Sequence, residues 1–354
     1  MNEIKKVAVA MSGGIDSAVA ALLVKEMGYD AIGATMRVCQ RLLSDGSDGV
    51  DIDISDAREI CEKLKISHEV YDFQSEFHEA VIKNFIDTYL EGGTPNPCVV
   101  CNRALKFGIL LDKVIENGAD MIATGHYARI ERVENGRYIL KKAIDEKKDQ
   151  TYMLWSLSQY QLSHTLFPLG ELTKPEIREI GEKHGFVNAH KSDSQDICFI
   201  PDGDYASFIE KTLGEKYPVG DYVDENGNIL GKHKGMIHYT IGQRKGLGIS
   251  MGRHIFVTDK NPTSNTVTLA DEDKLFKKTV KLRGINLIPF DTLDGKMRVE
   301  AKIRYSQKTA AAYAYQTGED EITLEFDEAQ RAPAKGQSAV VYDGEYVIGG
   351  GIIQ

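Results

Sequence analysis

The feature that most constrains this chain is a short apolar strand that runs into a bend of small residues and then into a helix. The strand is predicted at 7–11, the bend is Ser-Gly-Gly-Ile-Asp-Ser at 12–17, and the helix is predicted at 17–27. The first backbone N–H groups of a helix have no partners inside the helix, and the helix dipole favours negative charge there. The bend is therefore predicted to bind an anion such as phosphate.

The residue types in this bend suit the phosphates of a nucleotide. Gly13 and Gly14 let the backbone approach phosphate oxygens without a Cβ atom in the way. Ser12 and Ser17 add hydroxyl donors, and Asp16 can hold Mg²⁺ or orient the loop. No lysine follows the glycines, so the bend is not a Gly-x4-Gly-Lys-Ser/Thr loop. It resembles the PP-loop of ATP pyrophosphatases, which split ATP into AMP and pyrophosphate; the alternative is an ordinary strand-to-helix turn capped by serine.

Composition places the chain among ordinary soluble proteins. Its 354 residues suffice for two or three domains, and 42% are hydrophobic and 27% charged. No signal peptide is recognised and no apolar run approaches the ~18 residues that span a bilayer, so we expect a cytoplasmic protein without membrane contact. Five cysteines, an odd number, argue against a disulfide framework and leave reactive thiols, a metal site or core packing.

Charge is distributed unevenly along the chain. The net charge of −10 does not suggest nucleic-acid binding. The segment 231–254, however, carries Lys232, Lys234, Arg244, Lys245 and Arg253 and no acidic residue, and the segment 302–313 carries Lys302, Arg304 and Lys308. Such basic stripes let an acidic protein contact phosphates; the alternative is solvated loop charge.

The first 200 residues alternate between apolar runs and helical segments. Strands are predicted at 7–11, 31–38, 68–73 and 120–124, and helices at 17–27, 54–64, 76–90 and 105–117. This alternation predicts an α/β fold with a doubly wound parallel sheet. Ligands of such sheets bind at the carboxyl ends of the strands, and Met11, Val38 and Thr124 are such ends.

Two further segments of this region carry local signals. Residues 41–53 are rich in Ser, Asp and Gly and are predicted to form a polar loop. A return to helix is predicted over 156–191, with Thr173 at a cap, Pro175 near the first turn and Glu176 at the third position.

After about residue 204 the pattern changes to short alternating runs. They lie at 280–288, 297–305, 310–316, 322–326 and 339–348, with turn signals at 224–228 and at Asp343-Gly344. These runs predict a small C-terminal antiparallel β-barrel or sandwich, of which we expect the barrel. We place the domain boundaries at 1–203, 204–278 and 279–354.

Three cysteines occupy positions that suit chemistry. Cys98 and Cys101 form a Cys-x-x-Cys just before a predicted helix, where the helix dipole together with Arg103 and Lys106 favours a thiolate. Cys198 lies in a polar segment. These thiols are candidates for nucleophilic or redox chemistry.

The other cysteines and the histidines leave alternatives open. Cys61 lies among apolar residues of a predicted helix and is interpreted as packing, and Cys39, after the second strand, is left unassigned. A structural zinc site would take His126 or His190 as a fourth ligand. His126, next to a strand end, belongs either to a nucleotide site or to the core.

Taken in order, the motifs resemble those of the tRNA-specific 2-thiouridylases of the bacterial MnmA type. The resemblance extends from residue 7 to near residue 353. It rests on the segments 12–17, 96–102, 125–129, 148–150, 194–199, 231–248 and 303–306. Each motif alone is weak, whereas all of them in this order are specific. The resemblance implies a PP-loop (HUP-like) catalytic domain at 1–203, a tRNA-contacting domain at 204–278 and the barrel at 279–354.

The resemblance also implies a reaction, namely 2-thiolation of the wobble uridine (U34) of tRNAs for Glu, Gln and Lys. Uracil O2 is a poor leaving group, so ATP, with Mg²⁺ offsetting the phosphate charge, first adenylates it. A sulfur then attacks C2 and AMP leaves. A sulfur-donor protein, either a cysteine desulfurase or a sulfur relay, would supply that sulfur.

Residue roles follow from the same resemblance. The nucleotide site would comprise Ala10, Met11, Ser12, Gly13, Gly14, Ile15, Asp16, Ser17, Met36 and Gly125. The target base would be framed by Asn96, Pro97 and Cys98, and tRNA would contact Lys148, Asp149, Gln150, Arg304 and Tyr305. Cys198 would carry a persulfide, and Cys101 would release sulfide or close a disulfide with Cys198.

The chain departs from the family pattern at Cys98, where many members have Asp, so a candidate general base is missing. The change adds a third thiol to Cys101 and Cys198. Three thiolates and one open iron would suit a [4Fe–4S] cluster that carries hydrosulfide. A persulfide route and an iron–sulfur route both stay open at this point.

Two other classes of function compete with a thiolase. A PP-loop synthetase acting on a small molecule would need a glutaminase or amino-acid site in place of basic stripes and paired cysteines. A non-catalytic RNA-binding protein would not need an intact bend together with Cys101 and Cys198. ATP–pyrophosphate exchange stimulated by tRNA separates the three.

Overall fold

The computed structural model describes residues 5–39, 49–186 and 197–354, and the chain divides into two compact units. Unit 1 comprises Met1–Val81, Cys98–Pro201 and Glu345–Val347, and unit 2 comprises Ile82–Pro97, Asp202–Gly344 and Ile348–Gln354. Each unit is therefore assembled from segments far apart in the sequence.

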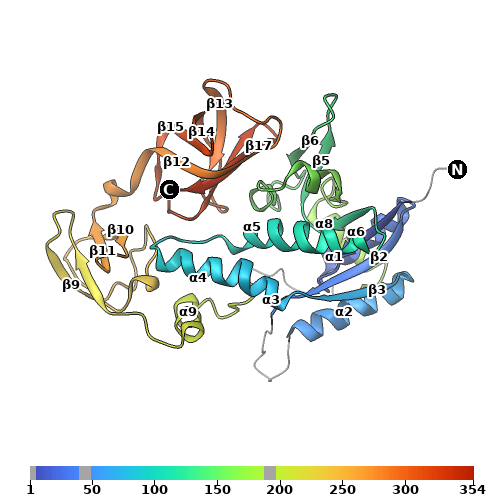
Figure 1. The fold of residues 1–354 in the computed structure, drawn as a ribbon, viewed down its shortest axis with the longest axis horizontal. Coiled ribbons are helices and arrows are strands. Elements are labelled where there is room, and N and C mark those ends of the chain that lie inside the picture. Colours follow the sequence, from blue (N-terminus) through green and yellow to red (C-terminus); the bar gives the residue numbers. More distant parts are fainter. Residues whose placement is uncertain (1–4, 40–48, 187–196) are drawn as a thin grey trace. The chain divides into compact units, whose positions relative to one another are not determined.

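Unit 1 is built on a five-stranded parallel sheet in the order β3-β2-β1-β4-β7 (Figure 1). Its strands are β1 (Lys6–Ala10), β2 (Asp30–Arg37), β3 (His68–Asp72), β4 (Met121–Thr124) and β7 (Thr165–Leu166). The chain first builds outward from β1 through β2 and β3, then returns to β4 on the other side. The switch point for ligand binding therefore lies between β1 and β4, as expected for the predicted doubly wound sheet.

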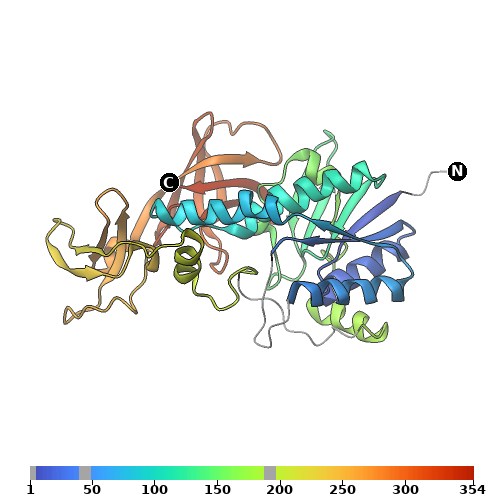
Figure 2. The same cartoon turned by 60° about the horizontal axis from the view of Figure 1, so that its bottom comes forward.

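Helices cover both faces of this sheet (Figure 2). One layer contains α1 (Ile15–Glu26), α2 (Gly49–Leu64) and α8 (Lys174–Lys183), and the other contains the continuous run of α5 (Pro97–Cys101), η2 (Asn102–Ile109) and α6 (Leu110–Glu116). Helix α1 is apolar nearly all round because it packs between the sheet, α2 and α8.

Two local predictions are corrected by these helices. Residues 49–53, predicted as loop, begin α2, while 41–48 lie outside the described residues. The helix predicted over 156–191 is two helices, α7 (Gln159–Ser163) and α8, separated by β7 and turns. The predicted start of α8 is confirmed, because the Glu176 carboxylate accepts hydrogen bonds from the Thr173 N–H and Oγ1, both at 2.7 Å.

A hairpin of unit 1 was missed by the sequence analysis. Strands β5 (Ala128–Arg132) and β6 (Tyr138–Lys142) pair antiparallel, and Tyr346 pairs with Lys141 of β6. The N–H of Lys142 donates to the Glu345 carbonyl at 2.8 Å. Residues 345–347 thus belong to the N-terminal unit by their hydrogen bonds. The remaining short elements of unit 1 include α3 (Gln74–Phe77), η1 (His78–Ile82, which reaches unit 2) and η3 (Thr151–Met153).

Unit 2 contains α4 (Lys83–Leu90), α9 (Tyr205–Leu213) and a four-stranded sheet in the order β10-β11-β8-β9. The strands are β8 (Gly220–Val223), β9 (Ile229–His233), β10 (Phe256–Asn261) and β11 (Thr266–Ala270), with short helices at η5 (Met236–His238) and η6 (Glu272–Leu275). The predicted turn at 224–228 is confirmed, because the Asp224 carboxylate accepts from the N–H groups of Asn226 and Asn228.

The predicted C-terminal barrel is confirmed. It consists of β12 (Phe276–Leu287), β13 (Met297–Lys302), β14 (Ala310–Gly318), β15 (Glu321–Arg331), β16 (Ser338–Asp343) and β17 (Tyr346–Ile353). Neighbours run in the order β12-β15-β14-β13-β16-β17, and the pairing of β12 with β17 closes the ring around an apolar core. None of the helices in the described residues is long and apolar enough to cross a membrane.

Candidate active site

The bend at 12–17 lies between β1 and α1 and has a backbone that requires glycine. Gly13 has φ = +72°, and a Cβ atom there would lie 2.6 Å from the carbonyl oxygen of Asp53. The Ser17 hydroxyl donates to the Gly14 carbonyl at 2.9 Å and accepts from the N–H of Ser12 at 3.2 Å. The hydroxyl of Ser17 therefore holds the bend closed, while Ser12 is exposed.

Asp16 is fixed by two side chains from distant segments. Its carboxylate accepts from the Tyr127 hydroxyl at 2.7 Å and from Lys174 Nζ at 2.8 Å to each oxygen. Lys174 is only 5% exposed and its ammonium group also lies 5.9 Å from the centre of the Tyr127 ring. In the structure Asp16 therefore orients the loop and holds a cation beside it.

Lys174 was missed by the sequence analysis, although the sequence carried a signal. A lysine in the first turn of a helix is disfavoured by the helix dipole. Lys174 is the first residue of α8, immediately after the cap at Thr173. A cation at such a position suggests a partner elsewhere, and Asp16 is that partner.

The other predicted nucleotide-binding residues gather at the same edge of the sheet. Gly125 follows β4, and a Cβ there would lie 2.8 Å from the Asp16 carbonyl carbon and 2.9 Å from the Ser17 nitrogen. Ala10 and Met11 end β1, Ile15 begins α1, and the half-buried Met36 lies near the end of β2. The Met11 carbonyl accepts from Thr35 Oγ1 at 3.0 Å, which ties β2 to the bend. The structure thus brings nine of them to the β1–β4 switch point, and Met36 lies on the neighbouring strand β2, near its carboxyl end.

The thiols of unit 1 form one cluster. Cys98 and Cys101 are three residues apart on α5 and so face the same side of the helix. The charged forms of Cys198, Cys98 and Cys39 each raise the pKa of Cys101, which places all three within electrostatic reach of it. Phe199 packs edge-on against Phe77 with ring centroids 5.5 Å apart and so anchors the turn that carries Cys198.

Burial decides the protonation state of these thiols. Desolvation raises the pKa of Cys101 to about 12, while the charge of Lys106 opposes this rise. Surrounding protein also raises the pKa of Cys98, although part of that residue contacts solvent. The prediction that this helix start favours a thiolate is therefore wrong for this state. All five cysteines are free thiols, so the disulfide between Cys101 and Cys198 is not formed.

Electrostatic and packing interactions link the thiols to the bend. Lys106 lowers the pKa of Cys98, of Cys101 and of His126, so its charge lies within reach of all three. His126 follows Gly125, the residue packed against the bend. The His126 ring packs 5.8 Å from the Phe107 ring, and its Nδ1 lies 2.7 Å from Thr124 Oγ1.

The geometry of the thiols does not amount to a metal site. Among the described residues, no group of three or more His, Cys, Asp or Glu side chains is arranged to hold a metal ion. His126, one proposed zinc ligand, is buried with its pKa lowered well below the usual range and is therefore neutral. His190, the other, lies outside the described residues, as do residues 194–196 of the motif that precedes Cys198.

Directly after Cys101 the helix widens into a π-helical segment. Helix η2 follows α5 without a break and carries Lys106. Gln161 Nε2 donates to the Arg103 carbonyl at 3.0 Å, and Asn102 Nδ2 donates to the Met153 carbonyl at 3.0 Å. Such π-helical turns occur frequently at functional sites. This one sets the position of Lys106 relative to the two cysteines of α5.

Two predicted tRNA contacts use their side chains inside unit 1. The buried Asp149 carboxylate accepts from the Ala143 N–H at 3.0 Å and from Thr151 Oγ1 at 2.7 Å. Gln150 Oε1 accepts from the N–H of Tyr127 at 3.0 Å, and the N–H of Gln150 donates to the Tyr127 carbonyl at 2.9 Å. The segment 148–150 therefore supports Tyr127, the partner of Asp16, and Lys148 is half-buried beside them.

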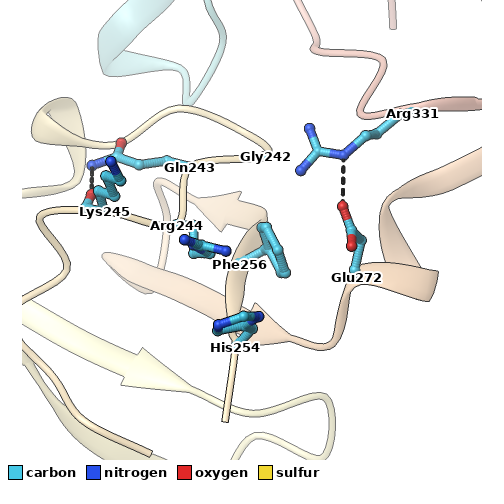
Figure 3. A pocket seen from close by; sticks show the side chains of 8 residues that line it. All are labelled: Gly242, Gln243, Arg244, Lys245, His254, Phe256, Glu272 and Arg331. Atoms are coloured by element: carbon cyan, nitrogen blue, oxygen red, sulfur yellow. Dashed lines mark hydrogen bonds and ion pairs between the residues drawn. The ribbon is translucent and has the colours of Figure 1, made fainter.

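Unit 2 contains a basic pocket of about 520 Å³ (Figure 3). It is lined by Gly242, Gln243, Arg244, Lys245, His254, Phe256, Glu272 and Arg331. Arg331 Nε donates to Glu272 Oε1 at 3.0 Å, and its guanidinium lies 5.4 Å from the Phe256 ring centre. One acidic residue thus faces three permanent cations, so the pocket attracts anions.

The predicted tRNA contact at Arg304 and Tyr305 adjoins this pocket. Arg304 Nη2 donates to the Ala332 carbonyl at 2.7 Å and to the Ile241 carbonyl at 3.3 Å. These acceptors neighbour Arg331 and Gly242, two of the pocket residues. Arg304 thus connects the barrel to the four-stranded domain, while Tyr305 is 44% exposed.

Family models match the whole length of the chain in three parts. Residues 5–202 match the tRNA methyl transferase HUP domain, 206–271 the tRNA methyl transferase PRC-barrel domain, and 277–353 the aminomethyltransferase beta-barrel domain. The tRNA-specific 2-thiouridylase MnmA of Clostridioides difficile (strain 630) is 50% identical to this chain over 99% of the chain and 98% of that protein. The chain is a member of the MnmA family of tRNA-specific 2-thiouridylases.

Other MnmA proteins are similarly close to the chain. The tRNA-specific 2-thiouridylase MnmA 2 of Clostridium tetani (strain Massachusetts / E88) is 48% identical over 99% of both chains. The MnmA of Clostridium perfringens (strain 13 / Type A) is 48% identical over 99% of this chain and 98% of that protein. The resemblance inferred from the motifs is thus confirmed over the full length.

Proposed function

We propose that this MnmA-family protein is a tRNA-uridine 2-sulfurtransferase that uses ATP to exchange O2 of the wobble uridine for sulfur. Its substrates would be the tRNAs for Glu, Gln and Lys. The observation that carries the proposal is the link between the two halves of the site. The charge of Lys106 lowers the pKa of both Cys101 and His126. His126 directly follows Gly125, the glycine that packs against the bend at 12–17.

In the first step, uracil O2 attacks the α-phosphate of ATP, and pyrophosphate leaves. The bend at 12–17 would bind the departing phosphates through the N–H groups at the start of α1. Lys174 would place positive charge beside them, and Asp16 and Tyr127 would orient that lysine. Mg²⁺ commonly binds through one or two carboxylates plus phosphates and waters, which Asp16 suits; the ion would offset the charge of the pyrophosphate.

In the second step, a persulfide on Cys198 attacks C2 of the adenylated base, and AMP departs with the former O2. Cys101 then loses its thiol proton and its sulfur attacks Sγ of Cys198, which breaks the persulfide S–S bond and leaves the outer sulfur on the base as a thiocarbonyl. A disulfide between Cys101 and Cys198 results, and a cellular dithiol returns both to thiols. A sulfur-donor protein would then reload Cys198.

The persulfide route is supported over an iron–sulfur route. The cluster would need Cys98, Cys101 and Cys198 in a ligand arrangement, and the described residues contain no such group. The persulfide route needs only two thiols, and it is supported by Cys198 lying close enough to Cys101 for its charge to raise the pKa of Cys101. Cys98 would then lie beside the target base together with Asn96 and Pro97.

The basic pocket of unit 2 supports an RNA substrate. Arg244, Lys245 and Arg331 would contact backbone phosphates, and the exposed Tyr305 would lie beside them. Lys148 would supply a contact from unit 1, with Asp149 and Gln150 shaping its loop.

The test is tRNA-stimulated ATP–pyrophosphate exchange, followed by mass spectrometry of the wobble nucleoside. The Cys198→Ser variant should retain exchange yet form no 2-thiouridine, since only the sulfur step needs that thiol. Cys61→Ser serves as control, because Cys61 is buried in the core of unit 1 away from the cluster that acts on Cys101. Exchange that ignores tRNA would indicate a small-molecule synthetase, and binding without exchange would indicate a non-catalytic RNA-binding protein.

A further inference from the structure

The connector between α4 and α5 leads directly into Asn96-Pro97-Cys98, the segment proposed to frame the target base. Its two glycines let the backbone of the connector lie close to neighbouring segments. Gly92 has φ = +79°, and a Cβ there would lie 3.2 Å from the Lys260 carbonyl oxygen. A Cβ on Gly93 would lie 2.8 Å from the Thr88 side chain and 3.1 Å from the Lys335 carbonyl oxygen. The connector is thus confined on two sides within unit 2.

Lys260 of β10 holds the connector from the four-stranded domain. Its Nζ donates to the Tyr239 carbonyl at 2.9 Å and to the Gly93 carbonyl at 3.2 Å. The ammonium group also lies 5.7 Å from the ring centre of Tyr89, near the end of α4. One buried side chain therefore joins α4, the connector and the segment after η5.

Lys260 is an unusual residue for a purely structural contact. It is 7% exposed, and its ammonium group donates to two backbone carbonyls. Desolvation lowers its pKa to about 8, and the neighbouring Asp259 opposes this only in part. A buried cation whose partners are two carbonyls and a ring costs stability, and in return it satisfies two backbone acceptors at once.

The barrel holds the same connector from its other side. The N–H of Thr94 donates to the Lys335 carbonyl at 2.7 Å. Gln337 Nε2 donates to the Thr94 carbonyl at 3.2 Å and to the Pro95 carbonyl at 2.9 Å. Consecutive carbonyls at 93, 94 and 95 are therefore each bound by Lys260 or Gln337, immediately before Asn96.

We propose that Lys260 and Gln337 are positioning residues for thiolation, which fix the carbonyls of residues 93–95 and so set how Asn96, Pro97 and Cys98 meet the target base. The inference rests on the proposed function. The four-stranded domain and the barrel both form hydrogen bonds with the connector. The geometry of the proposed base site therefore depends on the same two domains that line the basic pocket. Both residues act through the backbone of the connector.

The test compares Lys260→Met, Lys260→Arg and Gln337→Met with wild type in single-turnover thiolation at saturating tRNA and ATP. Lys260→Met should lower the single-turnover rate by about 10- to 100-fold, since a small misplacement of a reacting group costs this much. The tRNA dissociation constant should change less than threefold. Lys260→Arg retains a charged donor and should recover part of the rate. Lys277→Met, at an exposed position of β12, is the matched control.

Thermal melting separates positioning from simple support of the fold. Methionine removes a buried charge but also leaves the Tyr239 and Gly93 carbonyls without this donor, so the rate of Lys260→Met is compared with its folded fraction at the assay temperature. Gln337→Met provides a second reading from the barrel side and should show the same split between rate and affinity. Unchanged turnover in both variants, or a rate that falls only in proportion to the folded fraction, overturns the inference. If wild-type protein forms no 2-thiouridine, the proposed function fails instead.

Discussion

The ammonium group of Lys174 lies 2.8 Å from both carboxylate oxygens of Asp16, although 158 residues separate the two. The bend at 12–17 contains no lysine of its own, and α8 places Lys174 beside it. The Tyr127 hydroxyl bonds to the same carboxylate and so fixes the pair. The proposed nucleotide site therefore depends on three segments that only the folded sheet brings together.

Lys174→Met should abolish the first half-reaction while leaving RNA binding intact. Loss of a fixed charge beside the developing pyrophosphate should lower tRNA-stimulated ATP–pyrophosphate exchange by about 10²- to 10³-fold. The measurement is exchange of labelled pyrophosphate, with Lys183→Met in the last turn of α8 as control. An exchange rate within a few-fold of wild type would show that Lys174 does not assist the reaction of the nucleotide.

Gly125→Ala should damage the bend from the opposite side. The added methyl group would lie 2.8 Å and 2.9 Å from backbone atoms of Asp16 and Ser17, which cannot move aside as a flexible side chain does. We expect a loss of about 1–3 kcal/mol in unfolding free energy together with weaker ATP binding. Chemical denaturation and nucleotide titration measure both. Gly318→Ala, where the new atom meets only an ordinary contact at 3.5 Å, should leave both values unchanged.

Alkylation of Cys101 should be slow near neutral pH and should accelerate as the pH rises. Its pKa is raised to about 12, so the reactive thiolate is scarce at pH 7 and grows with increasing pH. Lys106→Met removes the charge that lowers this pKa and should slow alkylation further at each pH. Mass spectrometry of iodoacetamide-treated protein reports the rate for each cysteine. A Cys101 that reacts as fast as a free thiol would contradict the buried environment.

Removal of positive charge from the unit 2 pocket should change the salt dependence of tRNA binding. Each phosphate that no longer has a cation beside it should reduce the slope of log affinity against log salt by about 0.7–0.9. We expect Arg244→Gln with Lys245→Gln to flatten the slope by the equivalent of one to two phosphates, measured by binding at several salt concentrations. The control is Lys113→Gln on α6, whose ammonium pairs with Glu116. An unchanged slope would show that this pocket does not contact the phosphates of the RNA.

Local sequence signals predicted much of the architecture because they act over a few residues. The strand–bend–helix order, the Thr173–Glu176 cap and the turn at Asp343-Gly344 each depend on neighbours in the chain, and the structure contains all three. The division of the chain into 1–203, 204–278 and 279–354 stays a prediction. The structure adds that short segments of the chain cross between compact units.

Local sequence signals could not predict features that depend on contacts between distant segments of the chain. The pairing of Lys174 with Asp16 requires α8 and α1 to pack together, which no local pattern states. The thiol protonation was predicted in the wrong direction because desolvation depends on what packs around Cys101, whereas the helix dipole and Lys106 can be read from sequence. Asp149 and Gln150 are polar residue types that are usually found at protein surfaces. Only the folded chain places Thr151 and Tyr127 beside them as hydrogen-bond partners.

The hairpin of β5 and β6 has a consequence for how the protein is made. Lys142, Arg129 and Lys141 all bond to Glu345, which leaves the ribosome some two hundred residues after them. The ATP-binding half therefore cannot complete its hydrogen bonding during early synthesis and must wait for the barrel to be translated. A truncated protein that lacks residues 345–354 would have an impaired N-terminal half as well as an impaired barrel. Neither half should therefore be expected to fold normally without the other.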